Sequence, residues 1–508
     1  MKALLSQIKL VLALAMLGPV FDVGTHAAVP VLANAAEKSD RTTLRSLLKQ
    51  RADVNAPQAD GMTALHWAAY RDDLETAKLL ASANANATNR YGVTPLSLAC
   101  QNGNTAMVEF LLAQGADPNA TLRGGETVLM TAARTGQPGP VKALLARGAK
   151  VDAKERRAQT ALMWAAADGH AAVVELLLKA GGDFRTALPN SGFTPWFFAA
   201  RDGRAEVMRV MLKAGVDVNA TMDLEKPTAK GPRKGTSALL LAVENGHFDL
   251  ALDLVKAGAD PNDQRSGFTP LHVLTWVRKP QRGEDDGDPS PQGSGNLSSV
   301  QFIRELVKHG ADVNAKLKTG KGGAGQFSRV GATPFLMAAA TADAPYLRLL
   351  VELGADPKLG NVDHCTPLMV ACGIGVGSAA ANETAGAEPE VIEAAALLLK
   401  LGADVNAVDA NGETAMHGAA YKNLPKVIQF LANHGAKVEI WNRKNKYRLD
   451  PLGIAAGHRP GNFKPSDETL AALHKVMTDA GLPLPATVPV RSVTREAYPG
   501  AVEKIPVP

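Results

Sequence analysis

The chain of 508 residues is 46% hydrophobic but only 5% aromatic, a composition that suits tightly packed helices rich in Ala and Leu. Its formal net charge is +5 at pH 7, so composition alone does not indicate a nucleic-acid-binding protein. The three cysteines, an odd and small number, do not describe a disulfide framework.

The first residues carry the features of a secretory signal peptide. Lys2 and Lys9 flank or precede an apolar run, residues 10–17, and Thr25-His26-Ala27 offers small residues for cleavage. The run is shorter than the ~20 apolar residues that a membrane-spanning helix needs. We therefore predict a signal peptide over residues 1–27 and an exported protein, either periplasmic or secreted. The alternative is an uncleaved N-terminus that associates loosely with a membrane.

The following part of the chain is built from a unit that is clearest in residues 92–120. Thr94-Pro95 begins a helix, because proline fits the first helical turn, and Gly103 ends it. A second amphipathic helix carries Leu111 on its apolar face and ends at Gly115, which tolerates positive φ. Two helices this short cannot bury both apolar faces alone, so the unit requires neighbours of the same kind.

Such neighbours are present along the chain. The Thr94 position recurs, at several spacings near ~33 residues, at Thr63, Thr127, Thr160, Thr194, Ser237, Thr269, Thr333, Thr366 and Thr414, with Asp450 in the same place. The stretches T-A-L-H-W-A-A, T-P-L-H and T-A-M-H begin at Thr63, Thr269 and Thr414. This pattern resembles the T-P-L-H-x-A signature of ankyrin repeats. The resemblance implies an all-α ankyrin-repeat solenoid, in which helix-turn-helix repeats are joined by β-hairpin fingers.

The resemblance extends to about residue 482, and we expect one solenoid over residues 28–482 with a cap at each end. The first cap, residues 30–56, departs from the signature, and the last uses a helix over residues 467–480. The tail, residues 483–508, is rich in proline and is expected to be extended and disordered. Four insertions interrupt the period, at residues 221–235, 279–299, 316–330 and 373–390.

The insertions differ in charge. Two lie at fingers, residues 221–235 and 316–330, and with a shorter variant at residues 443–448 they carry net charges of +2, +4 and +4. The other two separate the paired helices of a repeat and carry −2 and −3. Fingers and helix loops lie on opposite edges of an ankyrin solenoid, so the resemblance implies a basic edge and an acidic edge. The alternative is that these are solvated loops without a partner.

The sequence offers no constellation of catalytic, cofactor-binding or metal-binding residues, so we expect neither an enzyme nor a cofactor. His66, His272 and His417 occupy the fourth position of the signature, where the resemblance implies a hydrogen bond to backbone between repeats. No two histidines have the i, i+4 spacing of a helical metal pair, and H-E-x-x-H is absent. Buried thiols are expected at all three cysteines, Cys100, Cys365 and Cys372.

What remains for function is a recognition surface. The ankyrin resemblance implies binding through finger tips and the ends of the first helices. The finger tips carry Arg90, Tyr91, Arg123, Arg156, Arg157 and Arg265, and the helix ends carry Tyr70, Arg71, Arg134, Arg201, Trp276, Tyr421 and Lys422. Protein interfaces are enriched in arginine and aromatic residues, although ordinary solvated side chains are the alternative explanation.

We therefore expect a non-catalytic protein-interaction scaffold with a protein partner, and the basic finger edge favours an acidic one. We expect a monomeric chain with no nucleic-acid ligand and no transmembrane segment. Two alternatives stay open. One is an accessory or regulatory subunit of a periplasmic enzyme, and the other is a binder of an acidic polymer or anionic membrane surface.

Overall fold

The computed structural model of the chain describes residues 30–224, 233–279, 291–320, 327–375, 386–458 and 465–484. Within these ranges every regular element is a helix, and strand-like pairing is limited to isolated bridges between Thr121 and Thr127 and between Thr221 and Ser237. The all-α class is therefore confirmed, but the described parts of the fingers are turns without the paired strands of a β-hairpin. The signal segment at residues 1–27 and most of the tail, residues 485–508, lie outside the described residues.

The chain divides into two compact units, Met1–Lys150 and Val151–Pro508, and each is described by itself. The repeat pattern of the sequence predicts one solenoid over residues 28–482 and does not predict the boundary between Lys150 and Val151. In both units the first helix of a repeat packs on the first helix of the next, and most of the second helices pack in the same way. Each unit is therefore a stack in which a repeat buries its apolar faces against its neighbours.

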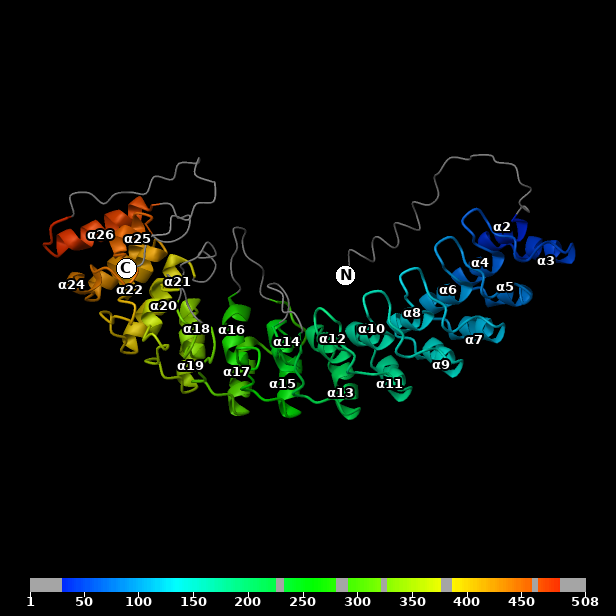
Figure 1. Cartoon of the computed structure of the whole chain (residues 1–508), viewed down its shortest axis with the longest axis horizontal. Coiled ribbons are helices and arrows are strands. Elements are labelled where there is room, and N and C mark those ends of the chain that lie inside the picture. Colours follow the sequence, from blue (N-terminus) through cyan, green and yellow to red (C-terminus); the bar gives the residue numbers. More distant parts are fainter. Residues whose placement is uncertain are drawn as a thin grey trace, which may run out of the picture. The chain divides into compact units, whose positions relative to one another are not determined.

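Figure 1 shows the first unit in blue and cyan, with successive helix pairs side by side. Its helices are α2 Val31–Glu37, α3 Arg41–Lys49, α4 Ala64–Tyr70, α5 Leu74–Leu79, α6 Pro95–Asn102, α7 Thr105–Ala113, α8 Val128–Thr135 and α9 Pro138–Ala146. The pair α2 and α3 lies where the sequence places the N-terminal cap. Leu32 and Leu44 are buried in this pair, whereas Arg41, Arg45 and Lys49 of α3 are exposed.

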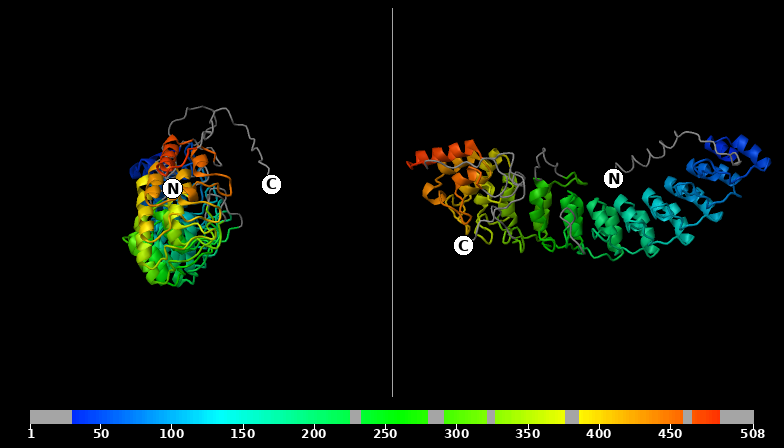
Figure 2. Two further views of the ribbon diagram at one scale, coloured as in Figure 1. Left: turned by 90° about the vertical axis from the view of Figure 1, so that its left-hand side faces the viewer. Right: turned by 45° about the horizontal axis from the view of Figure 1, so that its top comes forward.

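The second unit runs from teal through green and yellow to red in Figure 2. Its helices are α10 Ala161–Asp168, α11 Ala171–Lys179, α12 Pro195–Arg201, α13 Ala205–Lys213, α14 Ala238–Glu244, α15 Phe248–Lys256, α16 Pro270–Arg278, α17 Ser299–Lys308, α18 Pro334–Ala340, α19 Ala344–Glu352, α20 Pro367–Cys372, α21 Glu388–Lys400, α22 Ala415–Tyr421, α23 Pro425–Asn433, α24 Val438–Trp441, α25 Pro451–Ala455 and α26 Asp467–Asp479. The short helix α24 is not predicted by the repeat pattern. The final helix α26 packs on α23 and α25, where the sequence places the C-terminal cap.

The first helix of each repeat begins as its signature predicts. At α6 the Thr94 side chain accepts a hydrogen bond from the Ser97 N–H at 3.1 Å, and Pro95 occupies the first helical turn. Gly103 then ends the helix at φ 71°, a left-handed conformation that a side chain would strain. The threonine cap recurs at Thr127, Thr160 and Thr333, where the side chain again accepts a backbone N–H and marks the start of the helix.

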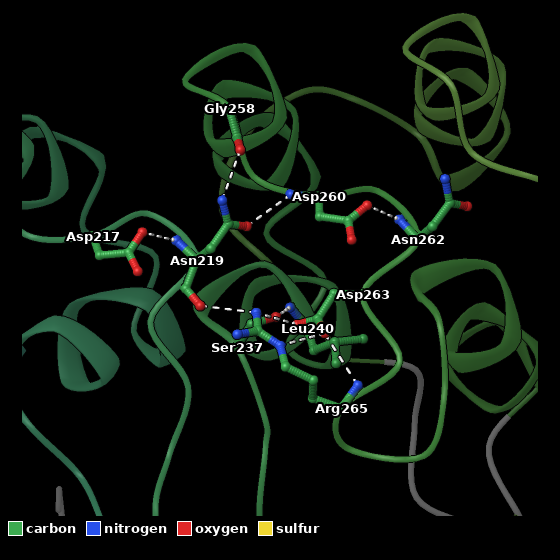
Figure 3. Close-up of polar contacts among 9 residues, drawn as sticks. All are labelled: Asp217, Asn219, Ser237, Leu240, Gly258, Asp260, Asn262, Asp263 and Arg265. Atoms are coloured by element: carbon green, nitrogen blue, oxygen red, sulfur yellow. Dashed lines mark hydrogen bonds and ion pairs between the residues drawn. The ribbon is translucent and has the colours of Figure 1, made fainter. Parts of the chain in front are cut away.

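An amide ladder joins the turn of one repeat to the next. Figure 3 shows one step, in which the Asn219 side chain donates to the Gly258 carbonyl at 2.9 Å and accepts from the Asp260 N–H at 2.9 Å. The same two bonds are made by Asn86, Asn119, Asn262, Asn314 and Asn406. Each such side chain satisfies a donor and an acceptor of the following repeat, and thereby fixes the spacing of neighbouring fingers.

The signature histidines make the expected contacts between repeats. His66 Nε2 lies 3.0 Å from the Val93 carbonyl oxygen, and its Nδ1 lies 2.8 Å from the Thr63 hydroxyl. His272 and His417 reach the carbonyl oxygens of Ala332 and Arg443 in the same way, each at 3.1 Å from Nε2. Burial lowers the pKa of both to about 4, because the charged imidazolium is poorly solvated there. These histidines are therefore neutral structural groups near pH 7.

The stacked helices enclose an apolar core in each unit. Leu111 of the first unit is fully buried, which agrees with the apolar helical face predicted from the sequence, and Leu177 is fully buried in the second unit. Cys100, Cys365 and Cys372 are buried free thiols, and burial raises the pKa of the Cys372 thiol to about 12. They pack as small apolar side chains.

Candidate protein-binding surface

Neighbouring finger tips of the first unit contact each other through their arginines. The Arg90 guanidinium lies 4.8 Å from the ring centroid of Tyr91, whose side chain is 41% exposed. Arg123 of the next finger donates through Nη2 to the Arg90 carbonyl oxygen. Neither arginine has a carboxylate partner within the described residues. This tip therefore presents an aromatic ring and two positive charges to solvent.

A second exposed group lies at the end of α4. The Tyr70 ring stands edge-on to Trp67, at 5.7 Å between centroids, and Arg71 lies 6.0 Å from the Trp67 ring. Tyr70 is 49% exposed, and Arg71 is exposed beside it. Arg134 is exposed at the end of α8. The helix-end residues predicted in this unit therefore all lie at its surface.

The finger tips of the second unit differ from one another. Arg156 and Arg157 are exposed, and neither has a carboxylate partner among the described residues. Arg265 is exposed but held: its Nε donates to Asp263 at 2.8 Å and its Nη2 donates to the Asn219 carbonyl oxygen at 2.8 Å (Figure 3). Arg265 therefore connects two fingers, and Asp263 largely compensates its charge.

The helix ends of the second unit are more enclosed than the sequence indicates. Arg201 pairs with Asp202 at 2.8 Å and lies 5.2 Å and 5.0 Å from the rings of Phe193 and Phe198. Trp276 is partly buried against Phe268. Both side chains are therefore committed in part to contacts within the chain.

The prediction that Tyr421 lies at the surface is wrong, because its side chain is only 1% exposed. Its hydroxyl donates to Glu413 at 3.0 Å, and Asn445 donates to the same Glu413 oxygen at 2.9 Å. Burial, and then the nearby Asp409, raise the pKa of Glu413 to about 7. The finger that carries Asn445 thus covers the ring, and Tyr421 belongs to the core.

Lys422 follows Tyr421 and is partly buried. Burial lowers the pKa of its amine to about 8. The nearby Lys279 contributes to that lowering, and it is itself paired with Glu390 at 3.0 Å. Since Lys279 and Glu390 belong to different helix-loop insertions, this ion pair joins the two insertions that were predicted to form an acidic edge.

Part of the positive charge on the fingers is also compensated within the chain, by the ion pairs Arg233–Glu244 and Lys234–Asp223.

In the part of the chain that the structure describes, no helix is long and apolar enough to cross a membrane. The same residues contain no cluster of three or more His, Cys, Asp or Glu side chains that could hold a metal ion.

Comparisons with known proteins bear on the repeats. A model of three ankyrin repeats matches residues 32–121 and 129–222, a model of many such repeats matches 99–145 and 384–432, and a single-repeat model matches 234–265. Together these ranges span more than half of the chain. The chain belongs to the ankyrin-repeat family. Ankyrin repeats serve as scaffolds for protein–protein interaction, and this chain has the corresponding fold.

Several curated relatives share part of this ankyrin-repeat chain. It is 27% identical over 242 residues to E3 ubiquitin-protein ligase KEG of Arabidopsis thaliana, covering 43% of this chain and 14% of that protein. It is 34% identical over 245 residues to ankyrin repeat and SOCS box protein 16 of Homo sapiens, covering 46% and 50%. It is 31% identical over 141 residues to the B-cell lymphoma 3 protein homolog of Mus musculus, covering 27% and 24%. The chain thus spans at most half the length of these relatives.

Sequence reasoning missed one group of residues on the ankyrin fingers. Arg233 and Arg329 were counted only as insertion charges, yet both lie near the ring of Phe268. Two finger-tip valines, Val362 and Val408, are 55% and 50% exposed. The signal for Phe268 was its place directly before the signature residue Thr269, and the signal for Arg329 was its place at the end of the insertion 316–330, four residues before Thr333.

Proposed function

We propose that this ankyrin-repeat protein is a non-catalytic scaffold that binds a partner protein through its finger tips and first-helix ends. The observation that carries the proposal is the exposure of adjacent arginines at a rigid tip. Arg156 and Arg157 project from a turn that Glu155 holds, since its side chain accepts from the Arg157 N–H at 2.7 Å. A fixed backbone with uncompensated cations costs little ordering entropy on binding.

Charge at these tips favours an acidic partner. Arg90, Arg123, Arg156 and Arg157 lack carboxylate partners among the described residues, so a partner carboxylate would meet no internal competitor there. Exposed tyrosines at Tyr70 and Tyr91 supply aromatic contact area of the kind that dominates interface energetics. We propose that the chain acts as a monomer in this role.

We also propose that the protein acts after export, in a periplasmic or secreted setting. The support is the order of basic residues, a short apolar run and small residues within residues 1–27. N-terminal sequencing of the protein from an envelope or culture-medium fraction tests this, and we expect a start near Ala28. A cytoplasmic pool that keeps Met1 would contradict the proposal.

The binding role is tested by affinity capture on the full chain, followed by association kinetics with the captured protein. The double variant Arg156→Glu/Arg157→Glu should slow association at low salt, and salt above ~0.15 M should reduce the difference. The matched control is Lys213→Glu/Lys256→Glu, which makes the same charge change on exposed positions of α13 and α15. If both double variants slow association equally, net charge and not the finger tip governs the encounter.

A further inference from the structure

Three consecutive fingers of the second unit bring side chains together around one aromatic ring. The guanidinium carbons of Arg233 and Arg329 lie 5.2 Å and 5.8 Å from the ring centroid of Phe268. Trp276 of α16 stands edge-on to Phe268, at 5.0 Å between centroids, and lies 5.6 Å from Arg233. Phe268 and Trp276 are only partly buried, so a ligand can reach this group from solvent.

The charges in this cluster are unbalanced. Arg233 donates through Nη2 to Glu244, while its Nε is buried without a hydrogen-bond partner in the described structure. Arg329 is exposed and has no carboxylate partner among the described residues. Desolvation, and then the charge of Arg233, lower the pKa of Arg329. Two cations therefore share one aromatic surface with a single carboxylate, and a second anion would relieve their repulsion.

Apolar surface continues beside the second arginine. Val330 follows Arg329, and its carbonyl oxygen accepts the Val362 N–H of the next finger at 3.0 Å. The Val362 side chain is 55% exposed. The finger next to Arg329 therefore adds an exposed aliphatic side chain to the aromatic pair.

We propose that Arg233 and Arg329, together with Phe268 and Trp276, bind a carboxylate side chain of an acidic peptide segment in the partner protein. Apolar residues next to that carboxylate would contact the exposed parts of the two rings and Val362. This inference rests on the proposed protein-binding function and adds the chemistry of one contact. It differs from the finger tips at Arg156 and Arg157, which offer charge without an aromatic surface.

An acidic peptide fits this surface better than a polyanion does. A guanidinium group binds a carboxylate through two parallel N–H donors. The flanking rings also bind apolar side chains, which a peptide can supply and polyphosphate cannot. Two guanidinium groups already stand near the Phe268 ring, which leaves less of that ring for a stacked nucleobase. Recognition therefore depends on carboxylate and apolar groups together.

Fluorescence anisotropy of the full chain with a short labelled peptide of alternating Glu and Leu tests the site. Arg329→Gln should weaken binding roughly fivefold or more, because it removes the uncompensated cation. Glu244→Gln should tighten binding by about two- to fivefold, since it releases Arg233 from its internal partner. Because a substitution at the surface could still disturb folding, thermal melts of both variants accompany the titrations.

The matched control is Lys318→Gln, which removes one exposed charge from the same finger as Arg329 without touching the rings. It should change peptide affinity by less than about twofold. Equal losses for Lys318→Gln and Arg329→Gln overturn the site, as does a peptide with Gln in place of Glu that binds equally well. The proposal also fails if the wild-type chain does not bind the acidic peptide, or if polyphosphate binds more tightly than the peptide does.

Failure here is distinguishable from failure of the proposed function. If Arg156→Glu/Arg157→Glu slows the captured partner while Arg329→Gln leaves peptide binding unchanged, the scaffold role stands and this site is wrong. If Arg329→Gln weakens the peptide while the finger-tip variant has no effect on the partner, the site stands and the finger tips are not the contact.

Discussion

The end of α4 in the first unit and the end of α22 in the second have nearly the same sequence and opposite exposure. Tyr70 closes A-L-H-W-A-A-Y and is 49% exposed, whereas Tyr421 closes A-M-H-G-A-A-Y and is 1% exposed. The residue before the signature threonine differs as well, being Met62 in one repeat and Glu413 in the other. The comparison teaches that a position in the repeat does not determine burial, because the following finger decides what covers it.

The following fingers differ in what their asparagine can bind. Asn89 and Asn445 both hold their turn through the side-chain oxygen, which accepts two backbone N–H groups. The Asn89 amide nitrogen then meets only the Met62 sulfur at 3.6 Å, a weak acceptor. The Asn445 amide nitrogen meets Glu413 at 2.9 Å and the Tyr421 hydroxyl at 3.2 Å. The buried carboxylate of Glu413 thus supplies the hydrogen-bond partner that holds Tyr421 in the core.

The largest effect expected from this comparison is that of Tyr421→Ala. Removing a fully buried aromatic ring should cost about 3–5 kcal/mol of unfolding free energy, and it also deprives Glu413 of a donor. Urea unfolding of the full chain measures it. Tyr421→Phe is the control, since it keeps the ring and removes only the hydroxyl. A cost under about 1 kcal/mol for Tyr421→Ala would mean that the ring is not in the core.

The reciprocal change, Met62→Glu, is expected to rank second. Met62 is 8% exposed, and Asn89 alone cannot compensate a carboxylate there. We expect a loss of roughly 3–4 kcal/mol at neutral pH, and less at pH 5 where the new carboxyl group is protonated. Urea unfolding at both pH values checks this. Met62→Leu, which keeps the volume, should be nearly neutral, and an equally large loss for it would assign the effect to packing.

The burial of Glu413 also predicts a pH dependence in the second unit. Its folded-state pKa of about 7 lies above the unfolded value of 4.5, so the folded chain binds more protons between these pH values. Stability from this group is complete below about pH 4.5 and is lost as pH rises through 7, by up to about 3 kcal/mol.

Unfolding free energies of the wild type and of Glu413→Gln, measured from pH 5 to pH 8, isolate this contribution. Gln keeps an oxygen that accepts from Tyr421 and Asn445 but cannot ionise. Asp409, whose pKa is also raised by burial, remains in both proteins and contributes equally. The unfolding free energies of the two proteins should therefore differ by an amount that changes with pH. A difference that is the same at every pH from 5 to 8 would show that Glu413 does not titrate in this range, and would refute the prediction.

Much of the fold could be predicted because its determinants are local. Thr94, Pro95 and Gly103 set helix boundaries through their own backbone and side-chain chemistry, so their spacing reveals the repeat. Exposure of the candidate site could not be predicted in the same way. The Tyr421 hydroxyl donates to Glu413, and the Arg265 guanidinium donates to the Asn219 carbonyl oxygen. These partners lie on neighbouring elements and come close only when the chain folds.

The smallest stability effect is expected at Tyr70, the exposed member of the compared pair. Tyr70→Ala removes a ring that contacts Trp67 at its edge, so the unfolding free energy should change by less than about 1 kcal/mol. If Tyr70 anchors the partner, its loss should instead raise the dissociation rate severalfold, since interface aromatics act mainly through dissociation. Surface-based kinetics with the captured partner measures this, with Tyr70→Phe as the control that keeps the ring. A dissociation rate unchanged by Tyr70→Ala but raised by Tyr91→Ala would move the aromatic contact of the first unit from the helix end to the finger tip.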